Sequence, residues 1–298
     1  MHPAFSDIIG HDLQLEYLGK ALERGNVAHA YIFAGPKGVG KTAIAERLAG
    51  ALLGVGGSIH GSTPTAGLRA HPDFYHVERP AEETEGGRKR DISINAVREL
   101  AHRMSLTAVY GTKVAIIEEA DAMTTEAQNA LLKTLEEPSG KSVMILLTDD
   151  IENILPTIRS RAVPLAFARV RTEALEAELE KRGTSHAMAR EIGLRSLGRP
   201  GVALRLTDAE AFQALKEAEA KIRAFLAESK AKKIATAGKM GKDTGSDARE
   251  AWFEVLAREL RLDLPTSANA LSALLDSRSA LGKNANTTLA LEHIALSL

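Results

Sequence analysis

The stretch FAGPKGVGKTAIAERLAG, residues 33–50, determines the class of fold, because it contains a complete phosphate-binding loop pattern. The pattern G-x-x-x-x-G-K-[ST] begins at Gly35 and ends at Thr42. The apolar run 30–34 predicts a strand before the loop, and the apolar spacing after it predicts a helix over 41–53. A strand before the loop and a helix after it are the context in which this motif binds phosphate.

The loop supplies the groups that a nucleotide phosphate needs. Glycines let successive backbone N–H groups point at the phosphates, at the positive end of the following helix. We expect Lys41 to reach the β- and γ-phosphates and the Thr42 hydroxyl to bind Mg²⁺. The predicted nucleotide-binding residues of the loop are Gly35, Pro36, Lys37, Gly38, Val39, Gly40, Lys41 and Thr42. A strand, turn and helix that bind nothing remain the alternative at this point.

The composition excludes several classes of protein. The 298 residues include 38 basic and 39 acidic ones, so no overall positive field attracts nucleic acid, and any DNA contact is local or comes from partners. Without cysteine the chain forms no disulfide and no thiolate metal site. The start, MHPAFSDIIGHD, lacks a signal-peptide pattern, and no apolar run reaches the roughly 18 residues of a membrane span. We therefore expect a soluble, cytoplasmic protein without membrane contact.

Buried strand patterns alternate with helical patterns in the first part of the chain. Strands are predicted at 30–34, 74–77, 113–117 and 143–147, and helices at 12–24, 41–53, 92–104 and 124–137. This alternation predicts a three-layer α/β domain with a parallel sheet over residues 1–167.

Strand signals disappear after this domain. Residues 168–207 predict a small helical domain, broken at Gly183 and at GRPG, residues 198–201. Residues 208–298 predict an all-α domain. Two polar stretches, AEETEGGRKRD at 81–91 and TAGKMGKDTGSD at 236–247, are predicted to be loops.

Polar side chains follow two of the predicted strands. Glu118, Glu119 and Asp121 lie at the carboxyl end of the strand 113–117, and Thr148 lies at the end of the strand 143–147. In P-loop hydrolases such groups hold Mg²⁺ and position the attacking water. Because the P-loop lies on the same chain, we predict that Glu118 and Thr148 belong to the nucleotide site and that Glu118 contributes to the Mg²⁺ site.

Three segments resemble the AAA+ subunits of bacterial clamp loaders. They are HAYIFAGPKGVGKT at 29–42, IIEEADAMTTEAQNALLKTLEEP at 116–138 and LPTIRSR at 155–161, within a similarity that runs from IIGHD at 8–12 almost to the C-terminus. The resemblance implies a P-loop AAA+ domain, a lid at 168–207 and an oligomerising collar at 208–298. It also implies a hetero-pentameric ring with motor and delta subunits, which places the sliding clamp on primed DNA within the DNA polymerase III holoenzyme. Adenine would lie near IIGHD.

The run EAQNALLKTLEEP is the most specific part of this resemblance. It predicts a helix with Ala127, Leu131 and Leu135 on one face, ended by Pro138. The opposite face carries Gln128 and Lys133. The family would direct these two side chains at DNA or a neighbouring subunit, and simple surface solubility is the other interpretation.

The sequence departs from the family pattern in three places. The region after the P-loop helix has no cysteine, so His60, His71 and His76 lack strong partners and we expect no zinc. By resemblance, Glu118 replaces the Mg²⁺-organising aspartate, while Glu119 takes the water-activating, catalytic position. Gly201 replaces an arginine that the motors place over the γ-phosphate, and Arg199 lies two residues before it.

These departures predict a chain that binds ATP or ADP with Mg²⁺ but hydrolyses it slowly or not at all. By resemblance, Arg161 is an arginine finger that acts in trans on the nucleotide of a neighbouring motor subunit. The alternatives are an ATP-hydrolysing motor subunit, a small-molecule P-loop kinase and a scaffold whose P-loop binds nothing.

Overall fold

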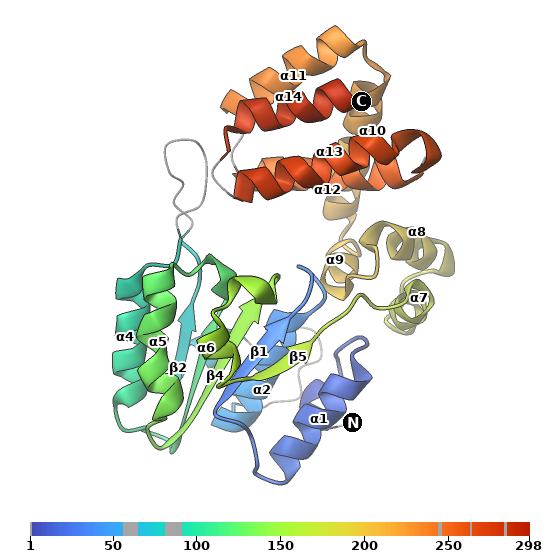
Figure 1. The fold of residues 1–298 in the computed structure, drawn as a ribbon. Coiled ribbons are helices and arrows are strands. Elements are labelled where there is room, and N and C mark those ends of the chain that lie inside the picture. Colours follow the sequence, from blue (N-terminus) through green and yellow to red (C-terminus); the bar gives the residue numbers. More distant parts are fainter. Residues whose placement is uncertain (1, 56–64, 81–90, 244–245, 263, 283–284) are drawn as a thin grey trace. The chain divides into compact units, whose positions relative to one another are not determined.

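A computed structural model describes residues 2–55, 65–80, 91–243, 246–262, 264–282 and 285–298 (Figure 1). The chain divides into two compact units. The first contains the residues up to Pro80 and Asp91–Thr207, and the second contains Asp208–Leu298. Among the described residues, no helix combines the length and the apolar character that crossing a membrane requires.

The first unit is built on a parallel sheet of five strands in the order β2-β3-β4-β1-β5. The strands are β1 (Ala30–Ala34), β2 (Phe74–Val77), β3 (Thr112–Ile117), β4 (Lys141–Thr148) and β5 (Val163–Ala166). Four of these were predicted from their buried apolar runs. The sequence analysis missed β5, because it is short, half-buried and contains Pro164, which a sheet tolerates at its edge.

Helices cover both faces of this sheet. They include α1 (Asp12–Glu23), α2 (Lys41–Leu53), α4 (Ile94–Ser105) and α5 (Thr125–Glu136), with the short α3 (Thr65–Arg69) and α6 (Pro156–Arg159). Side chains alternate along β1, so Tyr31 and Phe33 enter the core under α1 and α2, while Ile32 enters the core under α4 and α5. The prediction of a three-layer α/β domain is confirmed.

Three further helices complete the first unit: α7 (Thr172–Lys181), α8 (His186–Ser196) and α9 (Pro200–Arg205). Two backbone hydrogen bonds tie this group to the rest of the unit. Val170 N–H donates to the Gly198 oxygen at 2.8 Å, and Gly201 N–H donates to the Gly38 oxygen at 2.9 Å. The second bond brings α9 directly to the phosphate-binding loop.

The second unit is helical, as expected, with α10 (Ala209–Ala227), α11 (Lys230–Asp243), α12 (Ser246–Leu262), α13 (Leu264–Gly282) and α14 (Thr287–Ser297). The predicted loop at 236–247 is wrong, because α11 continues to Asp243. Packing against α14 overrides the low helix propensity of glycine here. A Cβ at Gly238 would lie 3.3 Å from Glu292 Oε1 of α14, so glycine permits the close approach. The predicted loop at 81–91 lies outside the described residues, except for Asp91.

Candidate functional site

The phosphate-binding loop joins β1 to α2 at the edge where all five parallel strands end, and its path requires glycine. Gly35 has a φ of +153°, and a Cβ there would lie 2.0 Å from the backbone oxygen of Phe167, just beyond β5. Gly40, with a φ of +109°, is the N-cap of α2. The loop therefore presents the N-terminal end of α2, with its unpaired N–H groups, to the space in front of it.

A pocket of about 290 Å³ lies at this helix end. It collects groups from four separate segments of the first unit. Its lining includes Lys37, Gly38, Gly40, Lys41 and Thr42 of the loop, Glu118 and Glu119 after β3, Asp149 after β4 and Gly201 of α9. Most of the predicted site residues thus meet in one place, and the hydroxyl of Thr42 and the carboxylate of Glu118 are the oxygen donors that Mg²⁺ prefers.

Lys41 is buried within the loop and makes three polar contacts. Its Nζ donates to the carbonyl oxygens of Gly35 and of Pro36, the latter at 3.1 Å, and pairs with Asp149 Oδ1 at 2.7 Å. The ammonium group is therefore held in front of the helix end by the loop's own oxygens. The sequence analysis missed Asp149, although its position directly after a predicted strand could have identified it.

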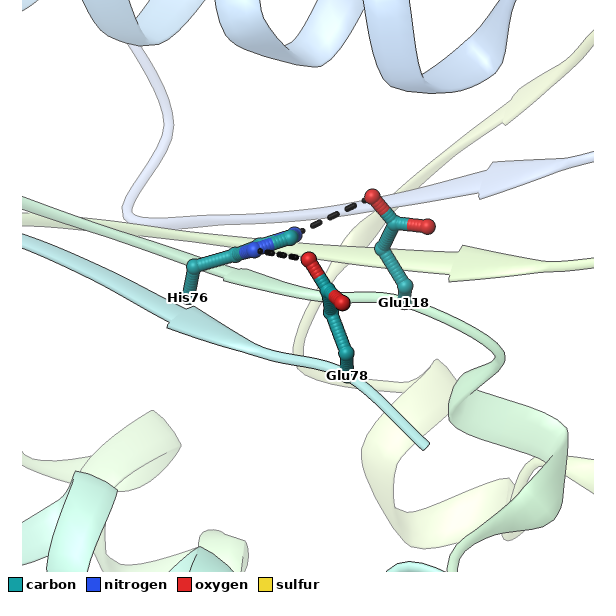
Figure 2. A group of neighbouring side chains, drawn as sticks. All are labelled: His76, Glu78 and Glu118. Atoms are coloured by element: carbon teal, nitrogen blue, oxygen red, sulfur yellow. Dashed lines mark hydrogen bonds and ion pairs between the residues drawn. The ribbon is translucent and has the colours of Figure 1, made fainter. Parts of the chain in front are cut away.

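The two glutamates after β3 have different partners. Glu118 lies beside His76 of β2, with 3.0 Å between Glu118 Oε1 and His76 Nε2 (Figure 2). Glu119 faces two cations, Lys37 Nζ at 3.3 Å and Arg79 Nη1 at 3.6 Å. Glu119 also has a left-handed backbone, with a φ of +47°, which is uncommon for a residue other than glycine. Its carboxylate is thus fixed by ion pairs at the edge of the pocket.

Thr148 and Asp121 lie deeper than the sequence analysis expected. Thr148 is buried, and its hydroxyl donates to the Asp150 oxygen and accepts from the Asp150 N–H, which closes a turn after β4. The Thr148 side chain is absent from the pocket lining, where its neighbour Asp149 appears instead. Burial raises the pKa of the Asp121 carboxyl, and Asp121 Oδ1 has no hydrogen-bond partner among the described residues.

The α9 helix meets the loop at Gly38 through the backbone of Gly201 and the side chain of Val202. Gly201 donates its N–H to Gly38, and a Cβ at Gly201 would lie only 3.1 Å from the Gly38 oxygen. Arg199 lies nearby, with its Cδ 3.6 Å from where a Gly38 Cβ would be, and its Nε donates to the Ser196 oxygen at 3.1 Å. Gly201 therefore brings no cationic side chain into the pocket.

Arg161 stands apart from this pocket, just after α6. Its guanidinium pairs with Glu136 Oε1 at 2.6 Å and donates to the Thr157 oxygen at 2.8 Å and to Ser160 Oγ at 3.1 Å. Side chains of both members of the ion pair are partly exposed, 35% for Arg161 and 49% for Glu136. Arg161 does not line the pocket of its own chain.

Gln128 does not face outward, so both interpretations given above for it are wrong. Its side chain is only 4% exposed. Nε2 donates to the oxygens of Asn153 at 3.0 Å and Met123 at 3.4 Å, and Oε1 accepts from Leu155 N–H at 2.8 Å. The segment 151–155 covers this side of α5, which helical periodicity by itself does not reveal. Lys133, on the same helix, is exposed.

Of the other histidines, His11 lies beside the phosphate-binding loop, whereas His71 precedes β2. His11, within IIGHD, has its Nε2 atom 2.9 Å from the backbone oxygen of Val39 in the loop. Burial lowers the pKa of His11, and its neutral ring donates this hydrogen bond through Nε2. His71 Nδ1 accepts from Asp73 N–H, and its ring lies beside Tyr110. His60 lies outside the described residues.

Comparison with known proteins finds that this chain is similar to subunits of DNA polymerase III. The family model described as DNA polymerase III, delta subunit, matches residues 10–171. The chain is 41% identical over 150 residues to the DNA polymerase III subunit delta' of Pseudomonas aeruginosa, covering 48% of this chain and 44% of that protein. It is 32% identical over 184 residues to the subunit delta' of Bacillus subtilis, covering 59% of this chain and 53% of that protein. The chain thus spans about half the length of these curated relatives.

A solved structure shares the fold along nearly the whole chain. It is a DNA polymerase III gamma subunit-related protein from Thermotoga maritima, with a TM-score of 0.52 and 19% sequence identity. The alignment covers 95% of this chain and 97% of that one. The fold of this chain therefore also occurs in that structure.

Proposed function

The chain belongs to the DNA polymerase III delta subunit family, since the family model covers residues 10–171, and on that premise we propose that it is a delta-prime-like subunit of a clamp loader. It binds ATP or ADP with Mg²⁺ in the P-loop pocket and hydrolyses the nucleotide slowly or not at all. Its partners are the motor and delta subunits of a hetero-pentameric ring, the sliding clamp and, through the assembled complex, primed DNA. The site is assigned no zinc.

The hydrogen bond from Gly201 to Gly38 is the observation that carries the weak-hydrolysis part of this proposal. Phosphoryl transfer is catalysed chiefly by cations and dipoles that neutralise charge on the γ-phosphate. Gly201 of α9 contributes only its backbone to the loop. Glu119, the expected water-activating group, is held by ion pairs with Lys37 and Arg79. Both features lower the expected rate without weakening phosphate binding.

Nucleotide binding is tested by calorimetry with the full chain. We expect ATP and ADP to bind in Mg²⁺, and Lys41→Ala to abolish binding, because it removes the buried ammonium group of the loop. Lys133→Ala, which removes an exposed lysine of α5, is the matched control and should bind as wild type does. Absence of binding at millimolar ATP would overturn the proposal and favour the scaffold alternative.

The role of Arg161 is tested in the reconstituted loader. In trans, an arginine finger is worth roughly a thousandfold or more in turnover at the site it completes. Arg161→Ala should slow ATP hydrolysis and clamp loading by the complex while leaving the nucleotide affinity of this chain unchanged. Arg159→Ala is the matched control, since Arg159 lies two residues before Arg161, at the end of α6, and pairs with Glu152 at 3.0 Å. Full loader activity with the Arg161 variant incorporated would refute the assignment.

An ATP-hydrolysing motor subunit is the second candidate, favoured by the complete P-loop. It predicts steady turnover of ATP by this chain with DNA and clamp present and no other loader subunit. The proposal made here predicts turnover near background in that assay.

A further inference from the structure

Three side chains, His76, Glu78 and Glu118, gather on one face of the sheet (Figure 2). His76 of β2 is paired in register with Ile116 of β3, so the residues two positions further along each chain, Glu78 and Glu118, also lie side by side. Side chains two residues apart in a strand share a face. The parallel pairing of β2 and β3 therefore brings all three groups together at the edge that carries the phosphate-binding loop.

The imidazole of His76 links the two carboxylates. Its Nδ1 lies 2.8 Å from Glu78 Oε1, and its Nε2 lies 3.0 Å from Glu118 Oε1. The ring is almost buried, with 9% of the side chain exposed, and it stacks on Phe74 with an interplanar angle of 19°. Figure 2 shows each carboxylate directed at its own ring nitrogen. The ring is thus fixed by packing as well as by both acidic partners.

This arrangement is a hydrogen-bonded relay and not a metal-binding group. A metal ion takes one nitrogen of a histidine, whereas here the carboxylates meet opposite nitrogens of the same ring. Glu78 Oε1 also pairs with Arg69 Nη2 at 2.8 Å, so a resident cation already neutralises it. Each ring nitrogen of His76 therefore faces a carboxylate oxygen, and His76 and Arg69 share the Glu78 carboxylate.

Glu118 belongs to the relay and to the P-loop pocket at the same time. His76 engages its Oε1, and Glu118 also lines the pocket beside Thr42. A glutamate has more side-chain torsions than an aspartate, and ordering them on metal binding costs conformational entropy. A hydrogen bond that fixes the carboxylate in advance lowers that cost. Carboxylates that bind metals are commonly held in this way by a second group, and loss of that group costs 10- to 100-fold in metal affinity.

We propose that His76 is a positioning residue that holds Glu118 for the Mg²⁺ of the bound nucleotide, and that Glu78 orients His76 for this task. The proposal rests on the proposed function, because it requires nucleotide in the P-loop. Neither His76 nor Glu78 lines the P-loop pocket, so both act only through Glu118.

The test compares nucleotide affinity with and without Mg²⁺ in the full chain. A fluorescent ATP analogue is titrated in Mg²⁺ and in EDTA, and the ratio of the two dissociation constants measures the contribution of the metal. His76→Ala should reduce that ratio by about 10- to 100-fold, with the EDTA affinity unchanged. His76→Gln, whose amide N–H can replace the Nε2 donor, should restore part of the loss. His102→Ala, an exposed histidine of α4, is the matched control and should leave the ratio unchanged.

Glu78→Gln is a second variant that keeps the proposal testable if the His76 variants fold poorly. The Glu78 side chain is 52% exposed, so we expect its replacement to leave the fold intact. It should lower the Mg²⁺-dependent ratio as well, since it alters the carboxylate that faces the ring at Nδ1 and orients it. A ratio within twofold of wild type in His76→Ala and Glu78→Gln would overturn the proposal. Binding of Co²⁺ by the nucleotide-free chain that is lost in His76→Ala would also overturn it and assign a metal site. Failure of wild type to bind the analogue even in Mg²⁺ would instead refute the proposed function.

Discussion

Replacement of Gln128 by leucine tests the corrected position of this side chain. Leucine has a similar volume and a high helix propensity, so α5 and its apolar packing are retained. What is lost is the bridge from α5 to the segment 151–155, where the Gln128 side-chain amide contacts Asn153 and Leu155. Its weaker contact with the Met123 oxygen is lost as well. The segment leads into α6, after which Arg161 follows, so the variant loosens the support of that arginine as well.

The magnitude follows from the three contacts. The Leu155 N–H and the Asn153 oxygen lose partners at 2.8 and 3.0 Å, whereas the contact to Met123 at 3.4 Å is weak. A buried polar group without a partner costs about 1–3 kcal/mol. The added apolar surface of leucine offsets part of the loss, so we expect a destabilisation of about 2–4 kcal/mol. For a unit of this size, that corresponds to a fall in melting temperature of roughly 5–15 °C.

The two units allow an internal control in the same sample. Far-UV circular dichroism follows the melting of the whole chain, while fluorescence of Trp252, the only tryptophan, follows the second unit. The Gln128→Leu variant should shift the dichroism transition of the first unit downward and leave the fluorescence transition in place. Lys133→Ala, on the exposed side of α5, should change stability by no more than about 0.5 kcal/mol. A melting temperature for Gln128→Leu within about 1 °C of wild type would show that the bridge contributes little and refute the argument.

Three further predictions concern the first unit and the whole chain. Asp73 is buried, and its carboxylate accepts hydrogen bonds from the N–H groups of Val109 and Tyr110 at 2.8 and 2.6 Å. Asp73→Ala removes both bonds and should accelerate hydrogen exchange at these two amides about 10- to 100-fold, measured by mass spectrometry. Burial opposes ionisation of Asp7, but hydrogen bonds and charge from Arg47 outweigh it and lower the pKa of Asp7. The Asp7 contribution to stability is therefore present above about pH 4 and lost as the pH falls through the lowered pKa, and denaturation of Asp7→Asn at several pH values should show a smaller loss on acidification than wild type. The chain should fold without metal, because it has no cysteine thiolates; one zinc per chain after dialysis, or unfolding by a chelator, would contradict this.

Local sequence patterns were sufficient for the framework of the nucleotide site. The loop from Gly35 to Thr42 has a fixed spacing, and each of β1, β3 and β4 is a short apolar run that is buried on both faces. These patterns can be recognised without reference to distant residues, because the motif and the apolar run of a central strand each occupy ten or fewer consecutive positions. The pocket lining from Lys41, Thr42, Glu118 and Glu119 followed from them.

Tertiary structure decided what depends on segments far apart in the chain. Gln128 is buried because the segment 151–155 packs over a helix face that periodicity assigns to solvent. Asp149 meets Lys41 across 108 residues, and His76 meets Glu118 across 42, through strand order and register that no local pattern encodes. The helix α11 persists through glycine because α14 packs against it. Partners of buried polar groups, and the persistence of a helix through glycine, are set by which elements become neighbours in space, and consecutive residues do not encode this.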